Sequence, residues 1–197
     1  QLSSQTGGAG QAGSLDVTAG EIVVDGTLTP DRFTAIQSQT AAGATGNARA
    51  VTLTADTIRI LGNGEVSSNT FSAGSAGSVT VNGETLLIDG TGGVAKKFTG
   101  ISSGSECSDS ASECGQLGNA GTVTVDVGSA TILGRGVIST NTAGTGTAGT
   151  VTLTSSSLLL DGRSTPESFT GISSDSTASA SGNAGAVDVT ADAITIL

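Results

Sequence analysis

The sequence predicts an all-β protein, a right-handed parallel β-helix (a solenoid) with three short strands in each coil. Three observations predict this fold: a similar segment recurs six times, each copy contains runs in which apolar and polar residues alternate, and no run shows a helical period. Such repeats stack so that each copy buries the apolar face of its neighbour. We expect about five complete coils and two partial ones, in one repeat segment that spans residues 1–197.

The first predicted strand of each coil follows a Gly-rich turn, as in GNAG followed by TVTV. The coils start near residues 14, 50, 78, 122, 150 and 186. Alternation with a period of two is typical of a strand that is buried on one face. Two apolar residues of each copy should therefore point inward, for example Val51 and Leu53, while Thr52 between them should face water.

The second predicted strand begins eight residues after the start of the first, as in IRILG from Ile58, and its alternate apolar residues should also point inward. A third short strand follows, as in GISS at 100–103 and at 171–174. β-Branched residues suit such strands. A thin core made of Val, Ile and Leu explains why the chain has four Phe but no Trp or Tyr.

Long and short coils alternate along the chain. Position eleven of each copy is Asp in the coils with a longer loop and Leu in the others. The outward residues Val23, Leu87 and Leu159 are apolar and lie in the long coils, where either the long loops cover them or they form a lateral association stripe. The chain begins and ends in mid-repeat, so we expect it to be a piece of a longer array.

Composition argues against several classes of function. The net charge is −10, with seven basic residues, and nucleic-acid binding depends on Lys and Arg neutralising phosphates. No run approaches the 18 apolar residues that a membrane-spanning helix needs. We therefore expect no nucleic-acid partner and no membrane span.

Catalytic and metal chemistry is also disfavoured. The usual serine or cysteine hydrolysis needs a His base, and the chain has no His. Two cysteines cannot build a Cys₄ zinc site, and the acidic residues are scattered. We expect no catalytic residues, no cofactor and no metal. A β-helical carbohydrate-active lyase or hydrolase stays open as the alternative.

Three stretches together support a resemblance to a known family: GNAGTVTV at 118–125, GVISTNTAGTG at 136–146 and LLLDGRSTPESFTGISS at 158–174. They resemble the repeats of filamentous haemagglutinin-like exoproteins of Gram-negative bacteria. The resemblance implies a secreted or surface-displayed fibre, usually an adhesin, exported by two-partner secretion. The implied partner is an outer-membrane transporter, acting through a parent-chain region outside this segment, and the receptor on a host, surface or matrix stays unidentified.

The two cysteines, Cys107 and Cys114, lie in a predicted loop insertion at 104–117. Their C-x₆-C spacing is wrong for a redox C-x-x-C motif and lacks partners for a metal. In a secreted protein, as the resemblance implies, the expectation is a disulfide. This insertion is where the segment departs from its own repeat, so we expect a contact loop here that includes Glu106, Asp109 and Glu113. Weak cation binding by these three acids is an alternative to ordinary solvated loop residues.

One outward row consists of threonines. The solvent-facing ladder comprises Thr52, Thr80, Thr124 and Thr152. Regular Thr rows on flat β-helices resemble ice-binding surfaces, so an ice- or matrix-binding face is a remote alternative function. Ordinary β-propensity on a solvated face explains the same row, and Asp16 and Asp188 interrupt it.

Overall fold

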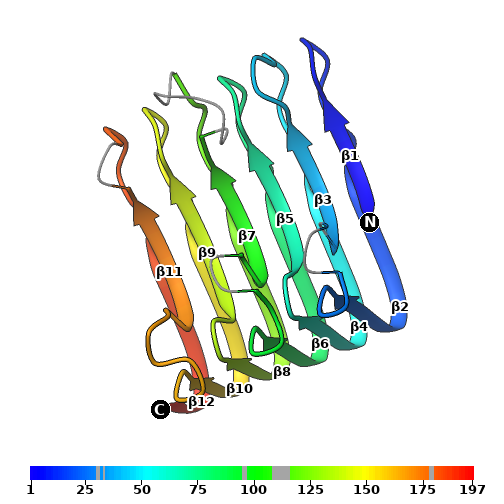
Figure 1. Ribbon diagram of the computed structural model, residues 1–197, viewed down its shortest axis with the longest axis vertical. Helices are drawn as coiled ribbons and strands as arrows, with labels where there is room; N and C mark the ends of the chain where they lie inside the picture. The colour runs from blue at the N-terminus through cyan, green and yellow to red at the C-terminus, as the bar shows by residue number, and fades with distance from the viewer. Residues whose placement is uncertain (30–31, 33, 95–96, 108–115, 178–179) are drawn as a thin grey trace.

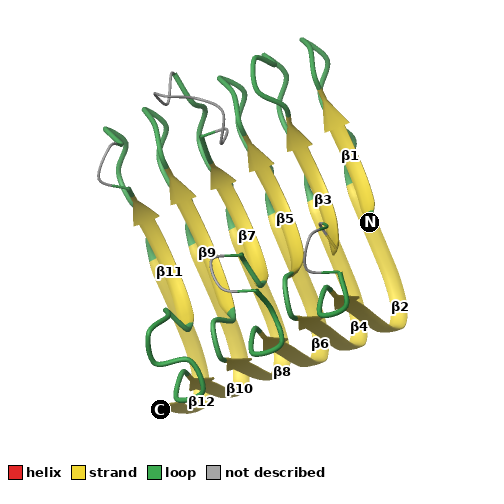
Figure 2. Cartoon of the chain, in the orientation of Figure 1, coloured by secondary structure: helices red, strands yellow, loops and turns green. Residues whose placement is uncertain are grey.

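A computed structural model describes residues 1–29, 32, 34–94, 97–107, 116–177 and 180–197. The described chain is all β and forms two six-stranded sheets in which neighbouring strands are parallel (Figures 1 and 2). Successive strands along the chain alternate between the two sheets, as in a solenoid. No helix long and apolar enough to cross a membrane occurs in the part of the chain that the structure describes.

The two sheets differ in the length of their strands. The long-strand sheet consists of β2 (Leu15–Asp25), β4 (Val51–Leu61), β6 (Val79–Asp89), β8 (Val123–Leu133), β10 (Val151–Asp161) and β12 (Val187–Ile196). The short-strand sheet consists of β1 (Leu2–Thr6), β3 (Thr34–Thr40), β5 (Gly64–Thr70), β7 (Gly100–Ser105), β9 (Val137–Thr142) and β11 (Gly171–Ser176). Each strand pairs with its equivalent in the next coil, and both sheets follow this order along the axis.

The prediction of three strands per coil is wrong, because the first two predicted strands form one continuous long strand. In β4 the inward side chains are odd-numbered up to Ala55, and from Ile58 onward they are even-numbered. Asp56 and Thr57 between them both point outward, and only Asp56 lacks a partner in the pairing with β2 and β6. The chain therefore bends at this point, and the hydrogen-bonded ladder resumes at once on the far side.

The core between the two sheets consists of stacked rows of small branched side chains. Register places like on like, so that Val51 pairs with Val79 and Val79 pairs with Val123. The inward positions predicted for both halves of the long strands are confirmed from β4 to β8, where Leu53, Ile58 and their equivalents are buried, whereas Val187, Ile194 and Ile196 of the last strand are exposed. The short strands contribute one apolar row, which includes Ile36, Val66, Ile101 and Ile138.

The outward apolar residues of the long strands do not form a stripe. Val23 is 50% exposed, so the alternative that a loop covers it is wrong, whereas Leu87 and Leu159 are partly buried. Register places Arg59 between Val23 and Leu87, and Thr131 between Leu87 and Leu159. The apolar residues are therefore separated by polar ones, which removes the basis for a continuous apolar interface.

The long loops instead rest on the tight turns of the short coils. Gly62 and Asn63 join β4 to β5 and both have positive φ, 38° and 68°. The Asn63 side chain accepts a hydrogen bond from Val94 N at 2.6 Å, and its own backbone N–H donates to Thr99 Oγ1 at 2.8 Å. At the equivalent turn, the Arg135 guanidinium donates to the carbonyl oxygens of Gly90 and Gly93, each at 2.6 Å. Side chains of the short coils thus position the loops of the long coils.

A row of buried hydroxyls ties the short strands to the Gly-rich turns. Ser103 Oγ donates to Gly77 O at 2.8 Å and accepts from Gly121 N at 2.8 Å, so it bridges the turn before its own coil and the turn after it. Ser38, Ser68 and Ser174 make the equivalent pair of bonds. These bonds satisfy backbone groups that the sheets leave unpaired, as buried polar groups require.

Replacing a fully buried core residue should destabilise the solenoid. We expect Leu53→Ala to lower the free energy of unfolding by about 2–5 kcal/mol, because it removes buried methyl groups and leaves a cavity in the stack. Thr54→Ala, at the neighbouring exposed position, should change it by less than about 0.5 kcal/mol. Urea denaturation followed by circular dichroism measures both changes, and equal effects of the two substitutions would contradict the assigned faces.

Two buried serines of β7 should differ in their contribution to stability. Ser103→Ala leaves a carbonyl and an N–H without partners, so it should cost about 1–3 kcal/mol. Ser105 Oγ is equally buried but has no hydrogen-bond partner among the described residues, so Ser105→Ala should be neutral or stabilising. Denaturation of the two variants side by side is the measurement, and a larger loss for Ser105→Ala would sink the idea.

Candidate functional site

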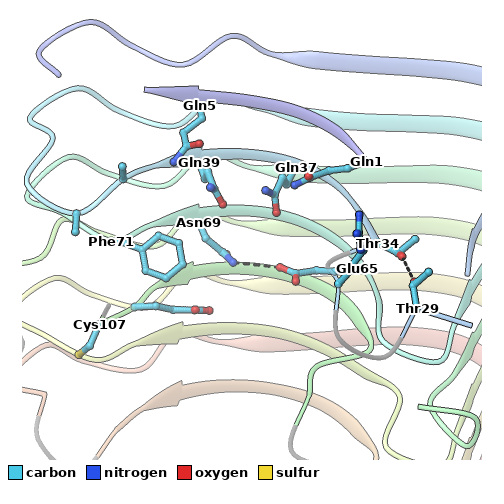
Figure 3. Close-up of a pocket in the computed structure, with 14 residues that line it drawn as sticks. Gln1, Gln5, Thr29, Thr34, Gln37, Gln39, Glu65, Asn69, Phe71 and Cys107 are labelled. Carbon is cyan, nitrogen blue, oxygen red and sulfur yellow. Dashed lines mark hydrogen bonds between the residues drawn. The ribbon is translucent and has the colours of Figure 1, made fainter. Parts of the chain in front are cut away.

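An open groove of about 990 Å³ lies over the outer face of the short-strand sheet (Figure 3). Its floor belongs to β1, β3 and β5. Thr29 and Arg32, from the connection between β2 and β3, line one side, whereas Ala41, Phe71 and Cys107 follow the ends of the short strands and line the other. We call this hollow the amide groove, after the side chains described next.

Amide side chains dominate the floor. Five of the lining residues carry an amide, namely Gln1, Gln5, Gln37, Gln39 and Asn69. Alternate side chains of a strand point to the same face, and the register stacks Gln5, Gln39 and Asn69 in one row across β1, β3 and β5. Each amide offers both a donor and an acceptor. The groove can therefore exchange hydrogen bonds with a ligand that is itself rich in donors and acceptors.

Asn69 is held in place by the sheet itself. Its Oδ1 accepts a hydrogen bond from Gly104 N at 2.8 Å, and Asn69 has no direct backbone pairing in the register of β5 with β7. Its Nδ2 donates to Glu65 Oε1 at 3.3 Å, along the same strand. Figure 3 shows these two side chains pointing toward each other across the groove floor. The carboxyl of Glu65 is thereby fixed in the groove.

The environment of Glu65 favours its protonated form. Burial away from water raises the pKa of Glu65 above its ordinary value, and hydrogen bonds from Ser67 and Asn69 oppose this rise only in part. The other described lining charges are Arg32 and Glu106.

Glu106 reaches the groove because Gly104 has no side chain. A Cβ at position 104 would lie 2.7 Å from Glu106 Oε1 and 2.6 Å from Asn141 Oδ1, so any larger residue would displace both. The neighbours in the same outward row, Asn69 and Asn141, carry amides. The space left by the missing side chain of Gly104 is therefore occupied by the carboxylate of Glu106, beside the amides of the row.

The predicted contact loop is described only in part. Glu106 and Cys107 lie at the edge of the amide groove, whereas Asp109, Glu113 and Cys114 lie outside the described residues. The disulfide and the weak cation site therefore stay predictions. Among the described residues, no group of three or more His, Cys, Asp or Glu side chains could hold a metal ion.

A second, smaller hollow of about 290 Å³ continues along the same face over β7, β9 and β11. Phe98 and Phe169 line it, and Glu106 lines both hollows. The ring of Phe169 lies over Gly171, where a Cβ would be 3.3 Å from the ring. Phe169 is 59% exposed. The smaller hollow thus adds exposed aromatic surface to the polar face.

The threonine ladder lies on the other sheet. Thr52, Thr80, Thr124 and Thr152 pair in register on adjacent long strands, and each is partly or fully exposed. Asp16 and Asp188 pair with the two ends of the row. The ladder and the amide groove therefore face different directions and cannot act as one site.

In comparisons with protein-family models, with curated proteins and with solved structures, no match to this chain was found. The resemblance to filamentous haemagglutinin-like repeats therefore stays a prediction that rests on the repeats themselves.

Sequence reasoning missed the amide groove. The alternation in TAIQSQT already indicates that Gln37 and Gln39 share a face of β3. Nothing in the sequence shows that Arg32, before β3, and Phe71, after β5, would lie at the two sides of a groove over that face. The row of amides could have been found by aligning the third strands of successive coils.

Replacing Glu65 should change the pH dependence of stability. Because the folded-state pKa is raised, the stabilisation from proton binding is complete below the unfolded pKa, about 4.3, and is lost as the pH rises through the folded pKa. Gln cannot ionise and keeps an acceptor for Asn69. Glu65→Gln should therefore gain stability relative to the wild type between pH 4 and pH 7.

Urea denaturation at the two pH values measures this gain. Glu84→Gln, at an exposed position of the long-strand sheet, controls for the loss of one negative charge from the protein. A stability difference between Glu65→Gln and wild type that is the same at both pH values would contradict the burial of the carboxylate.

Proposed function

We propose that this chain is a shaft segment of a secreted or surface-displayed fibrous adhesin, similar to filamentous haemagglutinin-like exoproteins. The observation that carries the proposal is the unbroken pairing of equivalent strands from coil to coil, in both sheets. A stack in which every coil offers the next the same ladder forms a rod that lengthens without changing its cross-section. Such a rod can hold a binding region away from a cell surface.

In this proposal the solenoid is right-handed, as connections between parallel strands almost always are. Each long strand bends in the middle, so its two halves form two faces of the coil and the short strand forms the third. The coil is then three-sided although it contains only two continuous strands. Export follows the two-partner route, through an outer-membrane transporter that recognises another region of the parent chain. We further propose that the segment needs no cofactor or metal and binds no nucleic acid, since its net charge is −10.

Localisation tests this proposal. Antibodies raised against the purified segment should label intact cells of the producing organism, or fibres shed into the medium, in immunogold electron microscopy. An antibody to a cytoplasmic protein of the same cells controls for leakage. Labelling that occurs only after permeabilisation would overturn the proposed secretion and surface display.

The second candidate is a β-helical carbohydrate-active enzyme. One observation favours it: a carboxyl of raised pKa, Glu65, shares the amide groove with a second carboxylate, Glu106. Glycoside hydrolysis uses such a pair, one as an acid and one as a base or nucleophile. Release of new reducing ends or unsaturated sugars from polysaccharides, abolished in Glu65→Gln, would replace the shaft proposal with this one.

A further inference from the structure

We propose that the outer face of the short-strand sheet binds a neutral polysaccharide chain, laid along the solenoid axis across the short strands. This site goes beyond the shaft role and does not depend on it, because a shaft that binds no glycan would still hold other regions away from the cell. The ligand class follows from the direction of the face, its hydrogen-bonding groups, its aromatic rings and its charge.

The direction of the face selects an extended ligand. The amide groove covers β1, β3 and β5, the smaller hollow covers β7, β9 and β11, and Glu106 lines both. Together they reach across all six strands of the sheet. Outward side chains repeat at each strand, about 4.8 Å apart, so the face presents similar groups at regular intervals. A polymer with repeating units matches that spacing better than a compact small molecule does.

The hydrogen-bonding groups suit sugar hydroxyls. Within the described chain, the side-chain amides of Gln5 and Gln39 make no hydrogen bond to the protein, and Gln37 makes only a long one of 3.5 Å to Ser3. A register row of serines runs along the same face; Ser67, Ser102 and Ser139 are buried in it, and Ser173 at its end is partly exposed and lines the smaller hollow. Amides and hydroxyls both donate and accept, as sugar hydroxyls do.

The sheet face disfavours a peptide added as an extra strand. That mode of recognition needs an exposed strand edge with free backbone groups. Over β3 to β9 the backbone groups are paired with the neighbouring strands on both sides, except at Ser68 and Asn69 between β5 and β7, where the Asn69 side chain accepts from Gly104 N instead. Only side chains are left to contact a ligand, which again favours a molecule recognised through many separate hydroxyls.

Aromatic rings supply the apolar part of the contact. Phe98 and Phe169 precede β7 and β11, which are separated by one strand, so the two coils lie about 10 Å apart along the axis. Phe71 lines the amide groove. The C–H faces of sugar rings are apolar and can pack on such rings, while polar groups fix their orientation.

The charge of the face excludes an anionic polymer. Its described lining residues include the acidic side chains of Glu106 and Asp175, together with Glu65, whose environment favours the neutral form, but a single cation, Arg32. The whole chain carries a net charge of −10. Like charges repel a polymer of sulfates or carboxylates, so the proposed ligand is a neutral glycan.

Affinity electrophoresis tests the proposal. The purified chain is run through native gels that contain a neutral polysaccharide (a β-glucan, a mannan, a xylan or a galactan) or an anionic one (polygalacturonate or heparin). At least one neutral polysaccharide should retard the protein, and neither anionic polymer should. Retardation by the anionic polymers alone, or by no neutral polysaccharide, would overturn the proposal.

Matched variants locate the binding. Phe169→Ala and Gln39→Ala should each weaken retardation by the neutral polysaccharide about fivefold or more, the loss of one stacking or hydrogen-bonding contact of about 1 kcal/mol. Thr54→Ala and Thr154→Ala, exposed on the long-strand sheet, should leave retardation unchanged. Circular dichroism confirms that all four variants fold. If the groove variants bind like wild type while the threonine variants do not, the site lies on the other sheet and the proposal fails.

Discussion

The stacking of small branched side chains in register, coil upon coil, is the contact on which the rest of this structure depends. Val51 lies on Val79 and Val79 on Val123, with the two sheets hydrogen-bonded around the row. A slip of one residue would turn every inward side chain toward water. The inward positions are therefore constrained in every coil, while loops outside the stack can differ in length without disturbing it.

The hydrogen bonds of polar groups inside the solenoid also recur at the same position in successive coils. The inward serines of the short strands, such as Ser103, bridge successive Gly-rich turns. The turns are therefore held by side chains as well as by their own backbones. β7 extends to Ser105, inside the insertion predicted at 104–117, and Ser105 takes the register position of Thr70 and Thr142. Thr142 donates to Gly146 O at 2.6 Å, but Ser105 Oγ has no partner among the described residues. The insertion therefore coincides with a local break in the hydrogen-bond pattern.

The loops on either side of the short-strand sheet turn its outer face into a groove. Without Arg32 on one side and Phe71 on the other, the amide row would be an ordinary solvated strand face. The walls concentrate amides, carboxylates and aromatic rings in one open channel along the axis. A repetitive shaft can thus carry a repetitive binding surface, in which each contact is weak and many contacts add up along a polymer.

The sequence by itself determined the parallel stacking, the position of each coil and the inward residues, because alternation and repeat spacing are local properties that survive without coordinates. Only the tertiary structure decided that Asp56 and Thr57 form a bend within one strand, since two outward residues in a row look the same in a bend and in a turn. It alone placed the amide groove. The loops that wall it are positioned by contacts between distant residues, such as Asn63 with Val94 and Arg135 with Gly90, and no local pattern encodes those contacts.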